Sequence, residues 1–351
     1  MLGGQVRLGV LGASLVAAMA LVSACGTGTE GATGSDEPPR GSQGEQSAAD
    51  AGVIGRSGQD AGTAAAPQLI MTMTGGLKAL NPKWSFNPRD VRGYENLRQP
   101  RLWGANEAKL RRFGGKRLVL TTGNRGLAAV VEFRSKRRYW AANVGDPQNP
   151  HSIELIPKGP RGMVAVASPA GREGIALYPV RRGQNTSAAT DREPLRKAHG
   201  VHWDGHRQLL WALGDKFLTA YRIGGTAARP KLVQDKAIGS ALPAGEHAGH
   251  DLSPVPGTKR LWVATGSRVH QYDPDRAPGA RRWVNTYPGS ARLAKRVGVK
   301  SVTTNPTTGR IAVTAANRSD QLTDRVDFLL PGGMFKTGGY GRIYKARWFQ
   351  P

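Results

Sequence analysis

Short runs of apolar residues recur along residues 68–351 at nearly constant spacing. Each run has five or six residues that favour β-strands, and small or turn-forming residues end it. The runs begin at Leu69, Leu118, Met163, Leu210, Leu261 and Ile311. Successive starts are 45 to 51 residues apart, and several runs are followed by a second alternating strand. No stretch of this region shows a sustained helical period, so the pattern predicts an all-β fold.

Six repeats of this length indicate a β-propeller, whose blades repeat about every 40–50 residues. A β-sandwich or jelly roll is also all-β but does not repeat its strand pattern six times at this spacing. The first run enters as the second strand of a blade, and residues 342–349 form a strand with no partner of its own. Pairing the two would remove both open edges. We therefore predict a six-bladed β-propeller over residues 68–351, closed by the C-terminal strand.

The N-terminal residues have the pattern of an export signal. Arg7 precedes an uncharged apolar run, Leu8–Val22, which is too short to span a membrane comfortably and suits a signal peptide. Small residues lead into Cys25, which resembles the lipobox cysteine that is acylated in bacterial lipoproteins. We expect a signal peptide over residues 1–24 and lipidation of Cys25; an ordinary cleaved signal peptide is the alternative. Cys25 is the only cysteine, so the chain has no intramolecular disulfide.

Residues 25–67 are rich in Gly, Ser, Thr, Ala and acidic residues and contain no aromatic residue. Such a segment cannot bury enough apolar surface to offset the entropy of ordering it, so it predicts a disordered tether. A flexible chain of this length reaches roughly 35–40 Å. We expect the propeller to lie at the extracytoplasmic face of the cell membrane, attached through its lipid anchor only.

The predicted propeller is strongly basic. The whole chain carries +25, and residues 68–351 hold 47 basic and 19 acidic residues, a net charge of +28. A field of this size attracts polyanions, which outside a cell include acidic glycans and other envelope polymers. The alternative is that these charges lie on the solvated surface and bind no particular partner. No nucleic-acid-binding motif stands out, so no specific nucleic-acid binding is expected.

A first strand precedes each apolar run by about 11 residues, and the residues that lead these strands have an unusual composition. The first strand of a propeller blade is innermost, so its leading residue is expected at the mouth of the central channel. The six predicted leading residues are Lys109, His151, His199, His250, Lys300 and Lys345.

Three converging histidines suit Zn²⁺, Mn²⁺ or another divalent transition metal. His151, His199 and His250 are therefore the predicted metal ligands, and Glu154 and Asp251 are predicted to orient them as hydrogen-bond acceptors. The predicted catalytic residues, which would hold an anionic group or act as a base, are Lys109, Lys300 and Lys345.

This site predicts a metal-dependent lyase or hydrolase acting on an anionic extracellular polymer, with a uronate-containing glycan as the first candidate. Three nearby ammonium groups raise the cost of binding a dication. A metal-free anion site, in a non-catalytic module that binds envelope polyanions, therefore stays open, and so does a purely structural role.

The motifs around these residues resemble a family of secreted actinobacterial proteins known only as a domain of unknown function. They are the lipobox, Asn-Pro-His151-Ser-Ile-Glu-Leu, Ala-His199-Gly-Val-His-Trp-Asp, Gly-His250-Asp-Leu-Ser-Pro, Val-Lys300-Ser and Tyr-Lys345-Ala-Arg-Trp. The resemblance covers about residues 100–350 and implies the propeller fold without an activity. More distantly, the leading histidines are similar to those of propeller lyases, such as peptidylglycine amidating lyase, virginiamycin B lyase and oligogalacturonate lyase. In those enzymes axial histidines hold a metal, which is an analogy of fold and site.

Overall fold

The computed structural model describes residues 68–73, 76–79, 84–97, 104–180, 188–317, 319–338 and 341–349. All of them belong to one compact unit, Asp60–Pro351. The expected signal peptide, the lipidated Cys25 and the tether lie outside the described residues. Among the described helices, none has the length and apolar character needed to cross a membrane.

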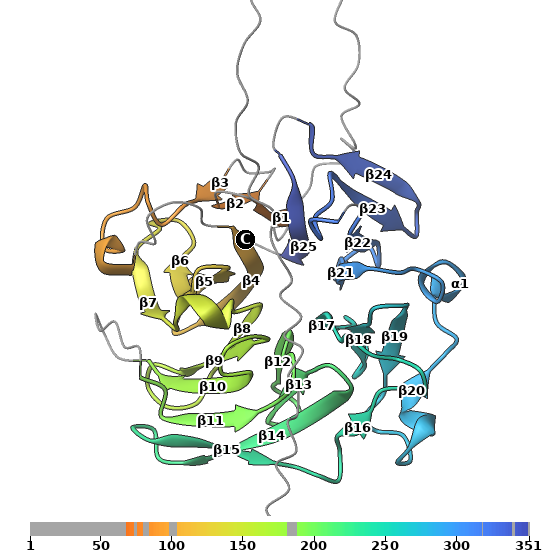
Figure 1. Ribbon diagram of the computed structural model, residues 1–351, viewed down its shortest axis with the longest axis horizontal. Helices are drawn as coiled ribbons and strands as arrows, with labels where there is room; N and C mark the ends of the chain where they lie inside the picture. The colour runs from red at the N-terminus through yellow and green to blue at the C-terminus, as the bar shows by residue number, and fades with distance from the viewer. Residues whose placement is uncertain are drawn as a thin grey trace, which may run out of the picture. The chain divides into compact units, whose positions relative to one another are not determined.

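The described strands form six antiparallel sheets around a common centre (Figure 1). From the innermost strand outward, the first three sheets contain β25 (Ile343–Phe349), β1 (Gln68–Met73), β2 (Gly76–Ala79) and β3 (Trp84–Phe86); β4 (Ala105–Phe113), β5 (Lys116–Gly123), β6 (Leu127–Glu132) and β7 (Arg138–Asn143); and β8 (Ser152–Ile156), β9 (Met163–Ser168), β10 (Gly174–Pro179) and β11 (Asp191–Pro194).

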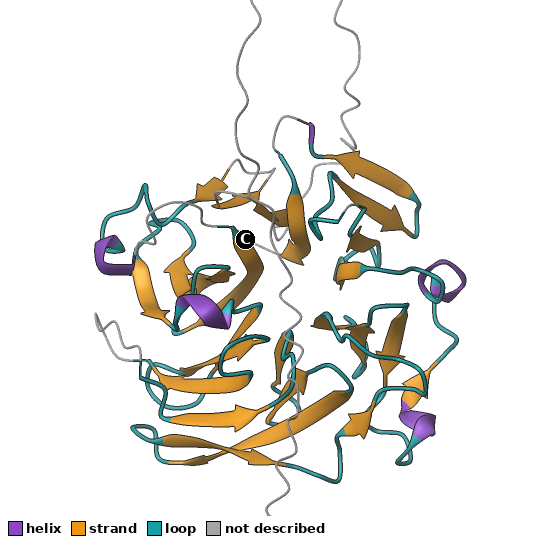
Figure 2. Ribbon diagram, in the orientation of Figure 1, coloured by secondary structure: helices purple, strands orange, loops and turns teal. Residues whose placement is uncertain are grey.

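The other three sheets follow the same order. They contain β12 (Gly200–Asp204), β13 (Leu209–Leu213), β14 (Phe217–Gly225) and β15 (Pro230–Gln234), with β16 (Ser240–Ala241) also pairing with β14; β17 (Asp251–Pro254), β18 (Leu261–Ala264), β19 (Val269–Tyr272) and β20 (Trp283–Val284); and β21 (Val299–Thr304), β22 (Ile311–Ala315), β23 (Arg325–Leu329) and β24 (Gly333–Lys336). The described helices are short (Figure 2): α1 (Ser290–Leu293) and the 3-10 turns η1 (Glu95–Leu97), η2 (Asp146–Gln148) and η3 (Ala280–Arg282). The six-bladed β-propeller is confirmed.

The C-terminal strand closes the ring as predicted. β25 pairs antiparallel with β1, with Leu69 opposite Trp348 and Ile70 opposite Arg347. It is thereby the innermost strand of the blade that the N-terminal strands complete. The pairing gives both strands a partner and joins the two ends of the described propeller.

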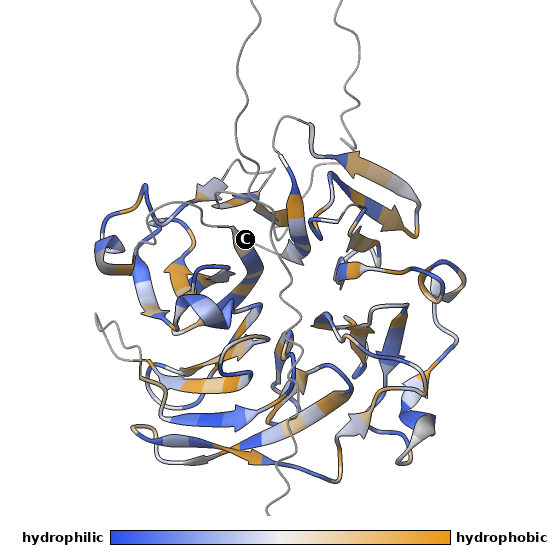
Figure 3. Ribbon diagram, in the orientation of Figure 1, coloured by the Kyte–Doolittle hydropathy of each residue, from blue (hydrophilic) through white to orange (hydrophobic). Residues whose placement is uncertain are grey.

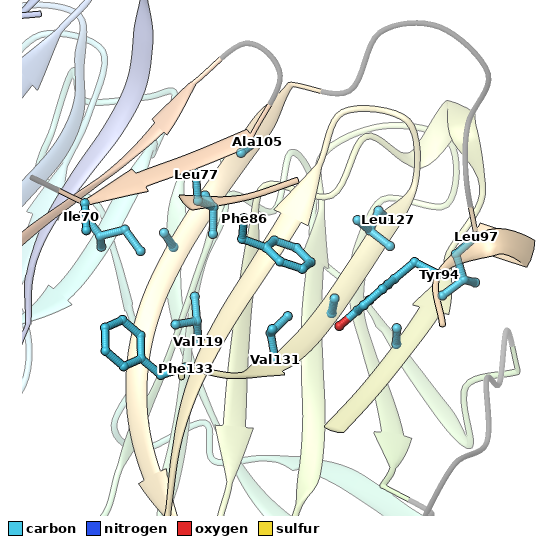
Figure 4. Close-up of a cluster of buried hydrophobic side chains, with 14 residues drawn as sticks. Ile70, Leu77, Phe86, Tyr94, Leu97, Ala105, Val119, Leu127, Val131 and Phe133 are labelled. Atoms are coloured by element: carbon cyan, nitrogen blue, oxygen red, sulfur yellow. The ribbon is translucent and has the colours of Figure 1, made fainter. Parts of the chain in front are cut away.

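The hydrophobic core lies between neighbouring blades. Figure 4 shows one of these interfaces, where Ile70, Leu77 and Phe86 of the first blade pack against Val119 and Val131 of the second. Both faces of a blade are covered in this way, so its middle strands are apolar on both sides. All six residues of β9 are buried, for example. Figure 3 shows the contrast with the hydrophilic outer strand β11.

The six innermost strands surround the centre of the molecule (Figure 1). Each contacts the innermost strand of the next blade, in the order β4, β8, β12, β17, β21 and β25, and β25 contacts β4 again. Polar residues at the start of each strand are thereby brought together from six directions.

Candidate functional site

The three predicted metal ligands meet at one end of the channel. His151, His199 and His250 directly precede β8, β12 and β17. The ring centroids of His151 and His199 are 4.5 Å apart with the planes perpendicular, and those of His199 and His250 are 5.0 Å apart. All three side chains are partly exposed. The structure therefore brings together the three histidines that the residue pattern placed at the mouth of the channel.

Lys300 and Tyr344 complete the circle between His250 and His151. The ammonium of Lys300 donates a hydrogen bond to Nε2 of His250 at 2.9 Å. The hydroxyl of Tyr344 lies 3.1 Å from Nδ1 of His151, and Lys300 Nζ lies 6.0 Å from the centre of the Tyr344 ring. We call the six residues at the leading positions of the innermost strands the axial ring: Asn106, His151, His199, His250, Lys300 and Tyr344.

Unusual backbone conformations hold two of the histidines. Lys197 and Ala248, each two residues before a histidine, have φ of 46° and 54°, in the left-handed region that residues other than glycine rarely occupy. Their carbonyl oxygens accept hydrogen bonds from Nδ1 of His199 at 2.8 Å and of His250 at 2.7 Å. Because a carbonyl can only accept, the proton lies on Nδ1 in both rings. Nε2 therefore carries the lone pair, and it lies on the other side of the ring.

The histidines of the axial ring are neutral at pH 7. Burial and the nearby ammonium of Lys345 lower the pKa of His199 to about 4, although the hydrogen bond to the Lys197 carbonyl acts in the other direction. Burial and the ammonium of Lys300 lower the pKa of His250 to about 3. Burial also lowers the pKa of Lys300 itself to about 8, with a contribution from Lys345.

The leading position of β25 is occupied by Tyr344 and not by Lys345 as predicted. The same hydrogen bond recurs between neighbouring blades and defines the register. Its acceptor is the side chain of the residue directly after a leading residue. Its donor is the backbone N–H two residues after the leading residue of the next blade. The pairs are Val201 N–H with Ser152 Oγ at 3.3 Å, Val302 N–H with Asp251 Oδ2 at 2.9 Å, and Ala346 N–H with Ser301 Oγ at 3.0 Å. Lys345 therefore lies one residue further along its strand.

The leading position of β4 is occupied by Asn106, and Lys109 lies three residues further along the strand. In this blade and the next, the residue after the leading position faces the fifth residue of the apolar run. The two pairs are Glu107 with Thr122 and Ser152 with Ala167. The register of β4 shifts next to Asn106. A bulge of this kind adds a residue that sequence spacing cannot reveal.

Lys345 belongs to a buried ionic cluster below the axial ring. Its Nζ lies 3.2 Å from Glu107 and 3.1 Å from Asp251. The guanidinium of Arg347 binds the same two carboxylates through four hydrogen bonds of 2.5–3.0 Å. Burial alone would raise the pKa of Glu107, but these cations hold it below its usual range. Two cations and two carboxylates therefore balance each other.

Lys109 belongs to a second part of the same network. Its Nζ lies 3.6 Å from Glu154, which Arg111 binds through two hydrogen bonds of 2.6 and 2.7 Å. Burial lowers the pKa of Lys109 to about 8 despite these carboxylates. His202 Nδ1 lies 3.7 Å from Glu154 and has no hydrogen-bond partner among the described residues. Glu154 and Asp251 thus bind cations, while backbone carbonyls orient His199 and His250.

Comparison with known proteins places the chain in a family. The model of a family of unknown function, DUF6528, matches residues 78–350. The chain belongs to this family. No curated protein matches it. The family model thus covers almost the whole propeller and brings no activity with it.

Two solved structures are similar to this DUF6528 member. One is titled a crystal structure of BBS1N in complex with ARL6DN, soaked with mercury, and has 12% identity over 71% of both chains, with a TM-score of 0.44. The other is the β-propeller domain of Cps50 (Swd1) from Myceliophteria thermophila, with 10% identity over 72% of this chain and 97% of that chain, and a TM-score of 0.40. Likenesses of this strength carry no argument about function.

Several residues of the candidate site in this DUF6528 member were not predicted from the residue pattern. Asn106 and Tyr344 lead their strands without being histidine or lysine, and Arg111 and Arg347 each lie two residues after a predicted lysine. The alternation of side chains along a strand was the available signal for the two arginines, because every second residue faces the same side. In the described part of the chain, no three His, Cys, Asp or Glu side chains are arranged to hold a metal ion.

Proposed function

We propose that the axial ring is the site of a lyase or hydrolase that acts on an anionic extracellular polymer, with His151, His199 and His250 as ligands of a divalent transition metal. The observation that carries this proposal is the pair of Nδ1–carbonyl hydrogen bonds at His199 and His250. Metal-binding histidines commonly use one ring nitrogen for such a bond, which leaves the other as the ligand. The lyase analogy drawn from the leading histidines is consistent with it.

The chemistry of the donor set suits a metal of this class, but the three histidines are not arranged to hold one, so metal binding would require their side chains to move. Neutral imidazoles are ligands of Zn²⁺ and Mn²⁺, and these rings are held neutral. Of the three lysines predicted to repel a dication, Lys109 and Lys345 are paired with carboxylates. Lys300 is the exception, since its ammonium occupies Nε2 of His250 and has to leave that nitrogen before a metal binds.

The chain's own residues have separable tasks in this proposal. Bound at the ring, the metal would polarise a carboxylate or carbonyl of the polymer or activate water. In its charged form, Lys300 would hold the anionic group of the polymer. Because the pKa of Lys300 is about 8, a minor fraction of this side chain is neutral at pH 7 and can accept a proton. Tyr344 stays protonated, because burial raises the pKa of its hydroxyl, and is available as a hydrogen-bond donor. Lys109 and Lys345 act as positioning residues.

A metal-free anion site is the second candidate, and the position of Lys300 favours it. This ammonium lies in the ring with a hydrogen bond to a neutral imidazole and not to a carboxylate. An anion that replaces His250 as its partner would be held by charge and by the field of the basic propeller. The chain would then be a surface module that captures envelope polyanions without changing them.

Degradation of polygalacturonate by the purified protein distinguishes the two candidates. We expect cleavage that a chelator abolishes and that Zn²⁺ or Mn²⁺ restores. Lys300→Met should lose at least about tenfold in rate and keep its metal, because one transition-state contact of this kind contributes a few kcal/mol. Binding that survives chelation, weakens steeply with salt and leads to no cleavage by metal-loaded protein would favour the capture module and overturn the enzyme.

A further inference from the structure

A groove with a volume of about 490 Å³ is lined in part by Lys197, which lies two residues before His199 of the axial ring. It is bordered by the turn that joins β13 to β14 and by the segment that follows β16. Strands β14 and β16 pair with each other, with Phe217 opposite Ala241. Lys197, Lys216, Phe217 and His247 are among the residues that line it. We propose that this groove binds the flanking sugars of an acidic polysaccharide whose reacting residue lies in the axial ring. This inference rests on the proposed function and assigns the substrate class.

The wall of the groove and the two held histidines belong to the same backbone segments. Lys197 lines the groove with its side chain and holds His199 with its carbonyl oxygen. Next to Lys197, Asp215 Oδ1 accepts a hydrogen bond of 3.0 Å from the N–H of Ala248, whose carbonyl holds His250. A polymer that leaves the ring over these two segments therefore enters the groove directly.

The charge of the groove suits a polyanion. Arg196 and Lys197 lie 3.4 and 3.8 Å from the single carboxylate of Asp215, and Lys216 adds a third, exposed cation. The other acid in the lining, Glu246, is bound by Arg268 at 2.7 Å. The two lysines and two acids of the lining balance, and Arg196 and Arg268, which bind the two acids from outside the lining, give the groove and its border a net charge of +2.

An exposed aromatic ring makes a sugar the better fit among polyanions. Phe217 is 53% exposed, directly after Lys216, although a ring of this size is ordinarily buried. Its face can cover the apolar face of one sugar ring while the neighbouring lysines bind carboxylates. Single-stranded nucleic acid, by contrast, is bound by several aromatic side chains on which successive bases stack. Phe217 is the one Phe, Tyr or Trp side chain among the described lining residues.

The test compares two matched double variants of the full chain. Lys216→Gln with Phe217→Ser removes one charge and one exposed apolar side chain from the groove. Lys231→Gln with Val233→Ser makes the same kind of change on β15, where Val233 is 52% exposed. Affinity for polygalacturonate oligomers and for their methyl-esterified, uncharged counterparts is measured by calorimetry, and metal content is measured on the same samples.

We expect the groove variant to lose about tenfold or more in affinity for the acidic oligomer, which corresponds to about 1.4 kcal/mol, with the β15 variant unchanged. Parent protein should bind the esterified oligomer more weakly than the acidic one. Equal affinities of the two variants, no binding by the parent, or an equal loss of affinity for single-stranded DNA would overturn the groove. Metal content separates the two proposals. If only the groove variant loses affinity and the protein contains no metal, the groove proposal stands and the proposed metal site is wrong.

Discussion

At the scale of single residues, the positions of two histidines depend on backbone strain at the residues that hold them. Lys197 and Ala248 hold left-handed conformations, which cost roughly 1–2 kcal/mol each for residues other than glycine. In return their carbonyl oxygens fix the tautomers of His199 and His250. Strain of this kind at a cluster of polar residues supports the hypothesis that the arrangement serves a function.

The lowered histidine pKa values predict a loss of stability in acid. His199 and His250 have pKa values of about 4 and about 3 in the folded chain, against 6.5 for the ordinary side chain. Below pH 6.5 the unfolded chain therefore binds more protons, and the free energy of unfolding falls as the pH falls towards 4. His199→Gln and His250→Gln should reduce this fall. Urea unfolding at neutral pH and at about pH 4.5 measures it; identical pH dependence in parent and variants would contradict the assignment.

At the scale of elements, the sequence predicted the repeat well and its register incompletely. The apolar runs identify the second strand of each blade, because both of its faces are buried. The leading residues of the innermost strands were correct for His151, His199 and His250, whose segments share a motif. At β4 and β25 the predicted leading residues lie three residues and one residue too far along the strand. A bulge next to Asn106 and the different sequence of the closing strand prevent the repeat spacing from giving the leading residue there. The ionic partners depend on contacts across blades, and the tautomers of His199 and His250 depend on the backbone conformation two residues earlier; the residue pattern reveals neither.

The closing strand predicts a large effect of a small truncation. Deleting 343–349 leaves β1 without its inner partner and leaves Glu107 and Asp251 buried without Arg347. Deleting residues 26–60 should change the free energy of unfolding little. The single variant Arg347→Met isolates the ionic part and should cost about 3–5 kcal/mol, the usual effect of removing one partner of a buried ion pair. Chemical denaturation measures all three, and an unchanged midpoint in Arg347→Met would show that the buried cluster is not stabilising.

At the scale of the whole molecule, the basic charge, the expected anchor and the propeller together lead to the proposal that the protein binds polyanions outside the cell membrane. The net charge of +28 on residues 68–351 would attract polyanions to the surface, and the ring and groove are where specific contacts are proposed. The expected lipid anchor and tether would keep this surface at the membrane while leaving the propeller free to reorient.

The anchor is tested by cell fractionation. Cys25→Ala removes the acceptor of the lipid, so the protein should appear in the medium or as an uncleaved precursor. Parent protein should partition into the detergent phase and carry a mass increase at its mature N-terminus. A Cys25→Ala variant that partitions like the parent would rule out lipidation at this residue and leave the ordinary cleaved signal peptide.

Elemental analysis of the purified propeller tests the central claim most directly. The parent should contain, or bind on titration, about one equivalent of a divalent transition metal, as expected for a single three-histidine site. The triple variant His151→Ala, His199→Ala, His250→Ala should contain none, while a variant of two exposed histidines, His206→Ala with His247→Ala, should match the parent. A parent that carries no metal and binds none on titration would contradict the account and leave an anion site at Lys300.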